Sequence, residues 1–141
     1  MEVGLISCTK RKRERDAQPA ELYMESTFFR KAREYAESTH DRWYVLSAKH
    51  HLLEPRGQSI EPYDETLSGA RITRKRDWAE TVLIQLYKED LIDDDVRLVF
   101  HAGRDYYDEL LPLLADTPVD VETPTDGLRF GETLAWYDEH G

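Results

Sequence analysis

Residues 3–10 read VGLISCTK, and this stretch decides the fold. Its apolar half is short and is ended by polar residues, which predicts a buried strand. Ser7, Cys8 and Lys10 follow directly where that strand would end. In open α/β sheets, ligands bind in the crevice outside the carboxyl ends of the strands, so these three side chains mark a first candidate site.

Strands and helices alternate along the rest of the chain. Short apolar, β-branched or aromatic runs predict further strands at 43–46, 96–100 and 119–121. Apolar residues at helical spacing predict four helices. The first runs from the N-cap Ser26 to about His40, and the others begin after Thr73, at Asp105 and at Leu128.

Two segments interrupt this regular pattern. Pro112 falls inside the predicted third helix and should end or bend it. Residues 49–70, which contain prolines and glycines, should be mostly irregular, and loops of this length are often functional. The alternation predicts a single α/β domain over 1–141, with a mainly parallel four-stranded sheet flanked by helices in three layers.

The composition excludes several classes of protein. The 141 residues contain one cysteine, which excludes an intramolecular disulfide and fits a reducing cytoplasm. No apolar run approaches the roughly 20 residues of a membrane-spanning helix, and no signal peptide is visible. We therefore expect a cytoplasmic protein without a membrane partner.

Charge is unevenly distributed around a formal net value of −10. Residues 1–76 hold 15 basic and 12 acidic side chains, and residues 77–141 hold 4 and 17, so the two parts carry +3 and −13. An acidic chain with few lysines is what we expect of a salt-adapted (halophilic) protein. The basic segments 10–15 and 71–76 can still bind a polyanion locally.

Polar residues follow every predicted strand, which predicts that they converge at one edge of the sheet. The segments are 7–10, 47–51, 101–104 and 123–127. Within them, Lys10 and Lys49 are either solvated or bind phosphate as point charges. Gly103, at a helix start, favours an anion through exposed backbone N–H groups. Gly127 and Gly131 favour either an anion or a tight turn.

Three side chains are candidates for catalysis. Cys8 is either a small buried apolar group or a nucleophile activated by a nearby cation. His50 is either an acid–base catalyst or a histidine bonded to a backbone carbonyl; the neighbouring His51 has the same alternatives. Asp64 is either a general base or a helix cap. No close ligand spacing indicates zinc, and we predict neither a metal nor a cofactor.

These residues resemble the pattern of a family of small uncharacterised prokaryotic proteins with a Ser-Cys-x-Lys start and a Leu-Ser-Ala-Lys-x-Gly-Leu centre. The chain has Ser7-Cys8-x-Lys10 and Leu46-Ser47-Ala48-Lys49, with His51 where the family usually has glycine. The resemblance covers nearly the whole chain. It implies that matching positions share a function: Ser7, Cys8, Lys10, Tyr23, Ser47, Lys49, Tyr63, Asp64, Gly103, Gly127 and Gly131.

The same family is distantly similar to the YaaA peroxide-stress proteins, which are associated with DNA binding. Similar domains accompany enzymes that modify guanine in tRNA or DNA. Both links imply a nucleotide or nucleic acid as partner, although a shared fold does not by itself carry a function.

Two functions remain open. In the first, the protein processes a nucleotide, nucleoside or nucleic-acid base, with glycosidic-bond chemistry and Asp64 as base. Lys10 and Lys49 would hold phosphate, while Ser7, Ser47 and Tyr63 would orient the sugar or base. In the second, it is a non-catalytic module that contacts the nucleic-acid backbone through its basic segments, including Arg11, Lys12 and Arg13.

Overall fold

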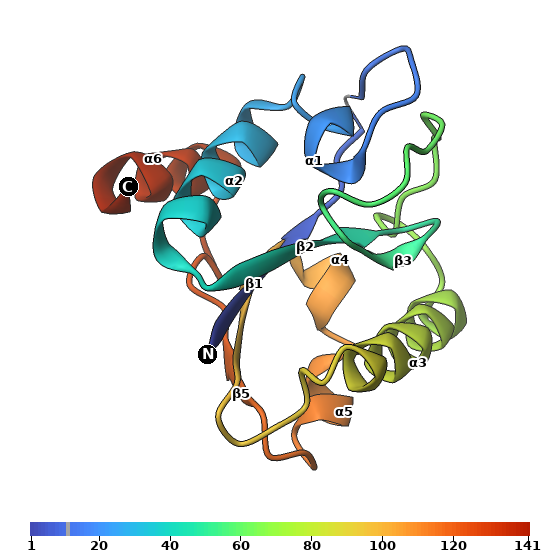
Figure 1. The fold of residues 1–141 in the computed structure, drawn as a ribbon, viewed down its shortest axis with the longest axis vertical. Helices are drawn as coiled ribbons and strands as arrows, with labels where there is room; N and C mark the ends of the chain where they lie inside the picture. The colour runs from blue at the N-terminus through green and yellow to red at the C-terminus, as the bar shows by residue number, and fades with distance from the viewer. Residues whose placement is uncertain (11) are drawn as a thin grey trace.

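A computed structural model of the protein describes residues 1–10 and 12–141. Arg11, expected to contact nucleic acid, lies outside the described residues. A single five-stranded sheet runs through the molecule, in the order β3-β2-β1-β4-β5 (Figure 1). Its strands are β1 (Glu2–Ser7), β2 (Arg42–Ser47), β3 (His51–Leu53), β4 (Arg97–His101) and β5 (Asp120–Glu122).

Four of the strands are parallel, as expected, but the expected number of strands is wrong. The additional strand is β3, which pairs antiparallel with β2, with Ser47 opposite His51. His51 has a φ of 67°, a left-handed conformation that reverses the chain directly after β2. This strand lies in the segment 49–70, whose prolines and glycines predicted a mostly irregular structure, and β3 is its one strand among the described residues.

Helices cover both faces of the sheet and complete three layers (Figure 1). One face carries α2 and α6, which contact each other; on the other, α3 contacts α4 and α5. The helices are α1 (Pro19–Leu22), α2 (Thr27–Thr39), α3 (Ile72–Lys88), α4 (Arg104–Tyr107), α5 (Leu111–Leu114) and α6 (Phe130–His140).

The helix boundaries test the predicted caps. Ser26 caps α2 as expected, since its Oγ accepts a hydrogen bond from the backbone N–H of Phe29 at 3.2 Å. The predicted cap Thr73 is wrong, because α3 already begins at Ile72. The predicted helix from Asp105 is broken into α4 and α5, and Pro112 lies in the first turn of α5, where its missing N–H costs nothing.

A chain of buried polar side chains ties α6 to the sheet. The Tyr137 hydroxyl of α6 lies 2.7 Å from His101 Nδ1, and His101 Nε2 lies 2.8 Å from His40 Nε2. His40 Nδ1 in turn lies 2.6 Å from a carboxylate oxygen of Glu2. His101 is fully buried, and burial is the main cause that lowers its pKa to about 3. His101 is therefore neutral at physiological pH.

Within the part of the chain that the structure describes, no helix has both the length and the apolar character to cross a membrane.

Candidate functional site

The candidate site is a pocket at the point where the strand order of the sheet reverses. β2 lies on one side of β1 and β4 on the other, so the segments that follow β1 and β4 diverge to opposite faces. Such a switch point leaves a crevice at the strand ends. A pocket of about 790 Å³ lies there, between the ends of β1 and β4, the start of α2 and the segment 125–134.

Three nearly buried residues that carry a hydroxyl group line this pocket. Ser7, Ser26 and Thr125 are only 6%, 8% and 8% exposed. Ser26 accepts the capping bond from α2, which leaves its own proton free to donate. Within the described part of the chain, no hydrogen bond engages the side chain of Ser7 or Thr125. Among the described residues no fully buried side-chain oxygen or nitrogen lacks a hydrogen-bond partner, so these two hydroxyl oxygens are open to the pocket and are suited to a ligand.

The pocket also presents positive charge. Lys10 lines it, and no carboxylate of the described chain lies within ion-pair distance of its ammonium group. Many other cations of this acidic protein are neutralised: Lys31 pairs with Asp138, and Lys75 with Asp105. The first residue of α2, Thr27, also lines the pocket, and the positive end of a helix dipole favours an anion.

The pocket also has apolar side chains and one carboxylate in its lining. Phe28, Leu128 and Phe130 line it, and Phe130 is 67% exposed at the start of α6. Asp126 is the one acidic residue among the described residues of the lining. The Tyr107 hydroxyl donates a 2.5 Å hydrogen bond to Asp126 Oδ1, which fixes the carboxylate. Burial, followed by this hydrogen bond, raises the pKa of Tyr107.

Other predicted site residues form a separate, buried cluster that does not line the pocket. Ser47 Oγ lies 2.6 Å from the Tyr63 hydroxyl, which lies 2.5 Å from the Tyr23 hydroxyl. Cys8 Sγ lies 3.2 Å from the Tyr106 hydroxyl. Burial raises the pKa of Tyr63. The hydroxyl and thiol groups of the cluster hydrogen-bond to one another. We therefore interpret the cluster as a structural support for the strand ends.

The remaining polar candidates lie outside the pocket. Lys49 and Asp64 are exposed. His50 packs edge-on against the Tyr63 ring, and burial, with the charge of Lys49, lowers its pKa. Lys12 Nζ lies 4.5 Å from the centre of the Tyr63 ring.

The expected convergence of the four segments is therefore only partial. The pocket takes Ser7, Lys10, Gly103 and Gly127 from the predicted set. Gly131 lies in the first turn of α6 and does not line it. Gly127 has a φ of 81°, a left-handed conformation. This conformation fits one of its two predicted roles, a tight turn, without excluding the other, anion binding.

Several pocket residues escaped the sequence analysis. Ser26 was recognised only as a helix cap, and Tyr107 and Phe130 only as parts of helices. Asp126 and Thr125 lay in the polar segment 123–127, which was singled out as a strand end without assigning either residue a role. The position of segment 123–127 directly after β5, the strand that pairs with β4, is the signal that could have identified Thr125 and Asp126.

The chain was also compared with known proteins. A model of a family of unknown function, DUF6884, matches residues 3–139. The chain belongs to the DUF6884 family. Neither a curated protein nor a solved structure matches it. The matched range contains both the pocket and the buried cluster of this DUF6884 protein.

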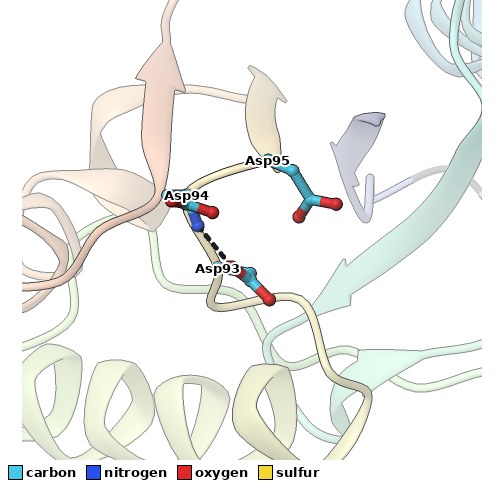
Figure 2. Close-up of side chains that lie close together, drawn as sticks. All are labelled: Asp93, Asp94 and Asp95. Atoms are coloured by element: carbon cyan, nitrogen blue, oxygen red, sulfur yellow. Dashed lines mark hydrogen bonds between the residues drawn. The ribbon is translucent and has the colours of Figure 1, made fainter.

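The DUF6884 protein also carries an acidic cluster at the opposite end of the sheet, before β4. Figure 2 shows Asp93, Asp94 and Asp95 on one turn, with carboxylate oxygens within 4.8 Å of one another. A hydrogen bond that the protonated Asp94 carboxyl donates to Asp93, together with the negative charge of Asp93, raises the pKa of Asp94. All three side chains are exposed, and such groups are common without a metal, so we assign no site here.

Proposed function

We propose that this DUF6884 protein is a nucleotide-processing protein that binds its nucleotide in the pocket between β1 and β4. The observation that carries the proposal is the set of nearly buried hydroxyls, Ser7, Ser26 and Thr125, beside the unpaired cation Lys10. Hydroxyls and an ammonium group together donate hydrogen bonds to phosphate oxygens.

The size and the mixed polar and apolar lining of the pocket also support a nucleotide. Its volume of about 790 Å³ lies in the range of about 300–1,000 Å³ that is usual for small-ligand sites. Phosphate would lie against Lys10 and the start of α2. The base would lie against Leu128 and Phe130, where Phe130 offers aromatic surface.

Chemistry at the glycosidic bond needs a carboxyl group within hydrogen-bond reach of the bound nucleotide. The sequence favoured Asp64, which is exposed and does not line the pocket. Within this proposal, Asp126 is the carboxylate that lies beside the ligand.

Titration of the protein with nucleoside 5′-monophosphates by calorimetry tests the proposal. We expect Lys10→Ala to weaken binding at least tenfold, because it removes the charge opposite the phosphate. Lys88→Ala is the matched control, since Lys88 is an exposed lysine outside the pocket. Lys49→Ala tests the other predicted phosphate ligand, and we expect it to bind like the wild type.

The proposal fails if no monophosphate binds, or if Lys10→Ala binds as tightly as Lys88→Ala. A dominant effect of Lys49→Ala would move the phosphate to the β2 end of the sheet.

The second candidate is a non-catalytic nucleic-acid-binding module, which a neighbouring open pocket favours. Lys10 lines both pockets. Lys12, Arg13 and Arg15 line the second pocket together with the acidic residues Glu14, Asp16 and Glu25. In this function a single strand runs along the four basic side chains. This function predicts that a single-stranded oligonucleotide binds more tightly than a monophosphate, with an affinity that falls steeply with salt. Arg13→Glu should then weaken oligonucleotide binding and spare the monophosphate.

A further inference from the structure

We infer that the nucleotide taken by the pocket is a ribonucleotide, and that Asp126 selects it by accepting a hydrogen bond from the 2′-hydroxyl of the ribose. This inference rests on the proposed function and names the class of its substrate. It starts from a carboxylate that stands in a pocket otherwise suited to an anion.

Asp126 is held in place rather than left to solvent. The Tyr107 hydroxyl donates to Oδ1 at 2.5 Å, and Tyr107 is itself buried, with its ring packed against Phe100 at 5.8 Å between ring centres. The backbone N–H of Asp126 bonds to the carbonyl of Thr123 at 3.2 Å. Both ends of the residue are therefore fixed, and Oδ2 has no hydrogen-bond partner among the described residues.

A fixed carboxylate works against the binding of phosphate alone. It places negative charge in a pocket where, among the described lining residues, only Lys10 is a cation without a carboxylate partner. The other lining cation, Arg104, lies 3.3 Å from Asp108 and is also attracted by Asp126 itself, so its charge is already shared between two carboxylates. Like charges in a partly enclosed site repel. The ligand must therefore bring a hydrogen-bond donor to Asp126 as well as an anion to Lys10.

A ribonucleotide has this arrangement of groups. Its phosphate and its vicinal hydroxyls lie at opposite sides of one sugar, and a carboxylate can accept from both hydroxyls because it has several lone pairs. Acidic side chains recognise the ribose 2′-hydroxyl in the same way in other α/β nucleotide sites. A deoxyribonucleotide would leave Asp126 desolvated without its donor, and sites built for a hydroxyl reject analogues that lack it.

The test compares the four ribonucleoside 5′-monophosphates with their 2′-deoxy counterparts by calorimetry, with inorganic phosphate as a third probe. We expect the wild type to prefer at least one ribonucleotide over its 2′-deoxy form by at least tenfold. Asp126→Ala should remove this preference. The same variant should bind inorganic phosphate as tightly as the wild type or a few-fold more tightly, because the repulsive charge is gone.

Two further variants separate selection from general effects. Tyr107→Phe keeps the ring but loses the hydroxyl that orients Asp126, so the preference should shrink while phosphate binding persists. Asp116→Ala removes one negative charge at an exposed position outside the pocket and should change neither.

Each outcome decides something different. Equal affinity for ribo and deoxy forms overturns this inference and leaves the proposed function standing. A loss in Asp126→Ala that is equal for both forms also overturns it, and indicates that the carboxylate contacts the base. If none of the eight nucleotides binds, the proposed function fails and this inference fails with it.

Discussion

Gly4 decides whether the buried polar chain under α6 can form. A Cβ at this position would lie 2.7 Å from Cδ2 of His40, closer than real side chains approach. His40 bonds to both His101 and Glu2, so it cannot move away without breaking one of these contacts. Glycine is therefore required at position 4 because His40 leaves no room for a side chain, and not because of the backbone conformation of Gly4.

We predict that Gly4→Ala lowers the free energy of unfolding by about 1–3 kcal/mol, because an added methyl group overpacks a site that cannot yield. Gly131→Ala is the control, since a Cβ there meets nothing within 4 Å. Urea unfolding followed by tryptophan fluorescence measures both. Equal stability of the two variants would show that His40 has room to shift.

Single residues also explain why the predicted site divides. Ser7, the last residue of β1, lines the pocket, while Cys8 directly after it does not line the pocket and meets Tyr106. The sequence could show that both residues end a strand, but which helices cover each face is a property of the tertiary fold.

Among the elements, α6 depends most on polar contacts with the sheet. Of its residues only Tyr137 is buried, and the Tyr137 hydroxyl bonds to His101 of β4. The neutral chain has one consistent direction, in which Tyr137 donates to His101, His101 to His40 and His40 to Glu2. Protonation of buried His101 would remove the acceptor of the Tyr137 hydroxyl and would place a positive charge between α6 and the sheet.

We predict that acid weakens the fold through His101. The folded-state pKa of about 3 lies below the ordinary value of about 6.5, so the unfolded chain binds the proton more readily. This contribution is complete above about pH 6.5 and is lost as the pH falls toward 3. Between pH 6 and 4 it should change the unfolding free energy by roughly 1.4 kcal/mol per pH unit at most.

The measurement is urea unfolding of the wild type and of His101→Gln across this pH range. Carboxylates titrate in both proteins, so the difference between the two curves isolates the histidine. Parallel curves would mean that His101 does not resist protonation.

At the scale of elements, the sequence predicted the helices and strands that local residue patterns determine, and it missed the strand that depends on a tertiary contact. The alternation of strands and helices, the Ser26 cap and the interruption of the helix near Pro112 were all readable, because each follows from local chemistry. The strand β3 was not, because it lies among prolines and glycines that predict irregular structure and it forms by pairing with β2.

Over the whole molecule, the acidic excess lies in residues 77–141, which hold 17 acidic and 4 basic side chains. Part of it is concentrated in the turn before β4, where Asp93 raises the pKa of Asp94 (Figure 2). Neighbouring like charges on a surface repel in dilute salt and are screened in concentrated salt. Four basic side chains that line the two pockets, Lys10, Lys12, Arg13 and Arg15, lie in the other half of the chain.

We predict that the melting temperature rises when KCl is increased from about 0.1 M to about 2 M, because the screening length falls from about 10 Å to below 3 Å. A double variant, Asp93→Asn with Asp95→Asn, should melt higher at low salt and gain less from added KCl. A melting temperature that is flat or falls with salt would contradict the expectation of a salt-adapted protein.

The two short outer strands have a consequence for aggregation. Both edges of the sheet are strands of three residues, β3 and β5, while the longer strands β1, β2 and β4 are paired on both sides. An unpaired edge is where another chain adds by backbone hydrogen bonding, and short edges offer little template for it. Resistance to fibril-like growth is therefore built into the topology. It would persist in concentrated salt, where charge repulsion between molecules no longer protects the protein.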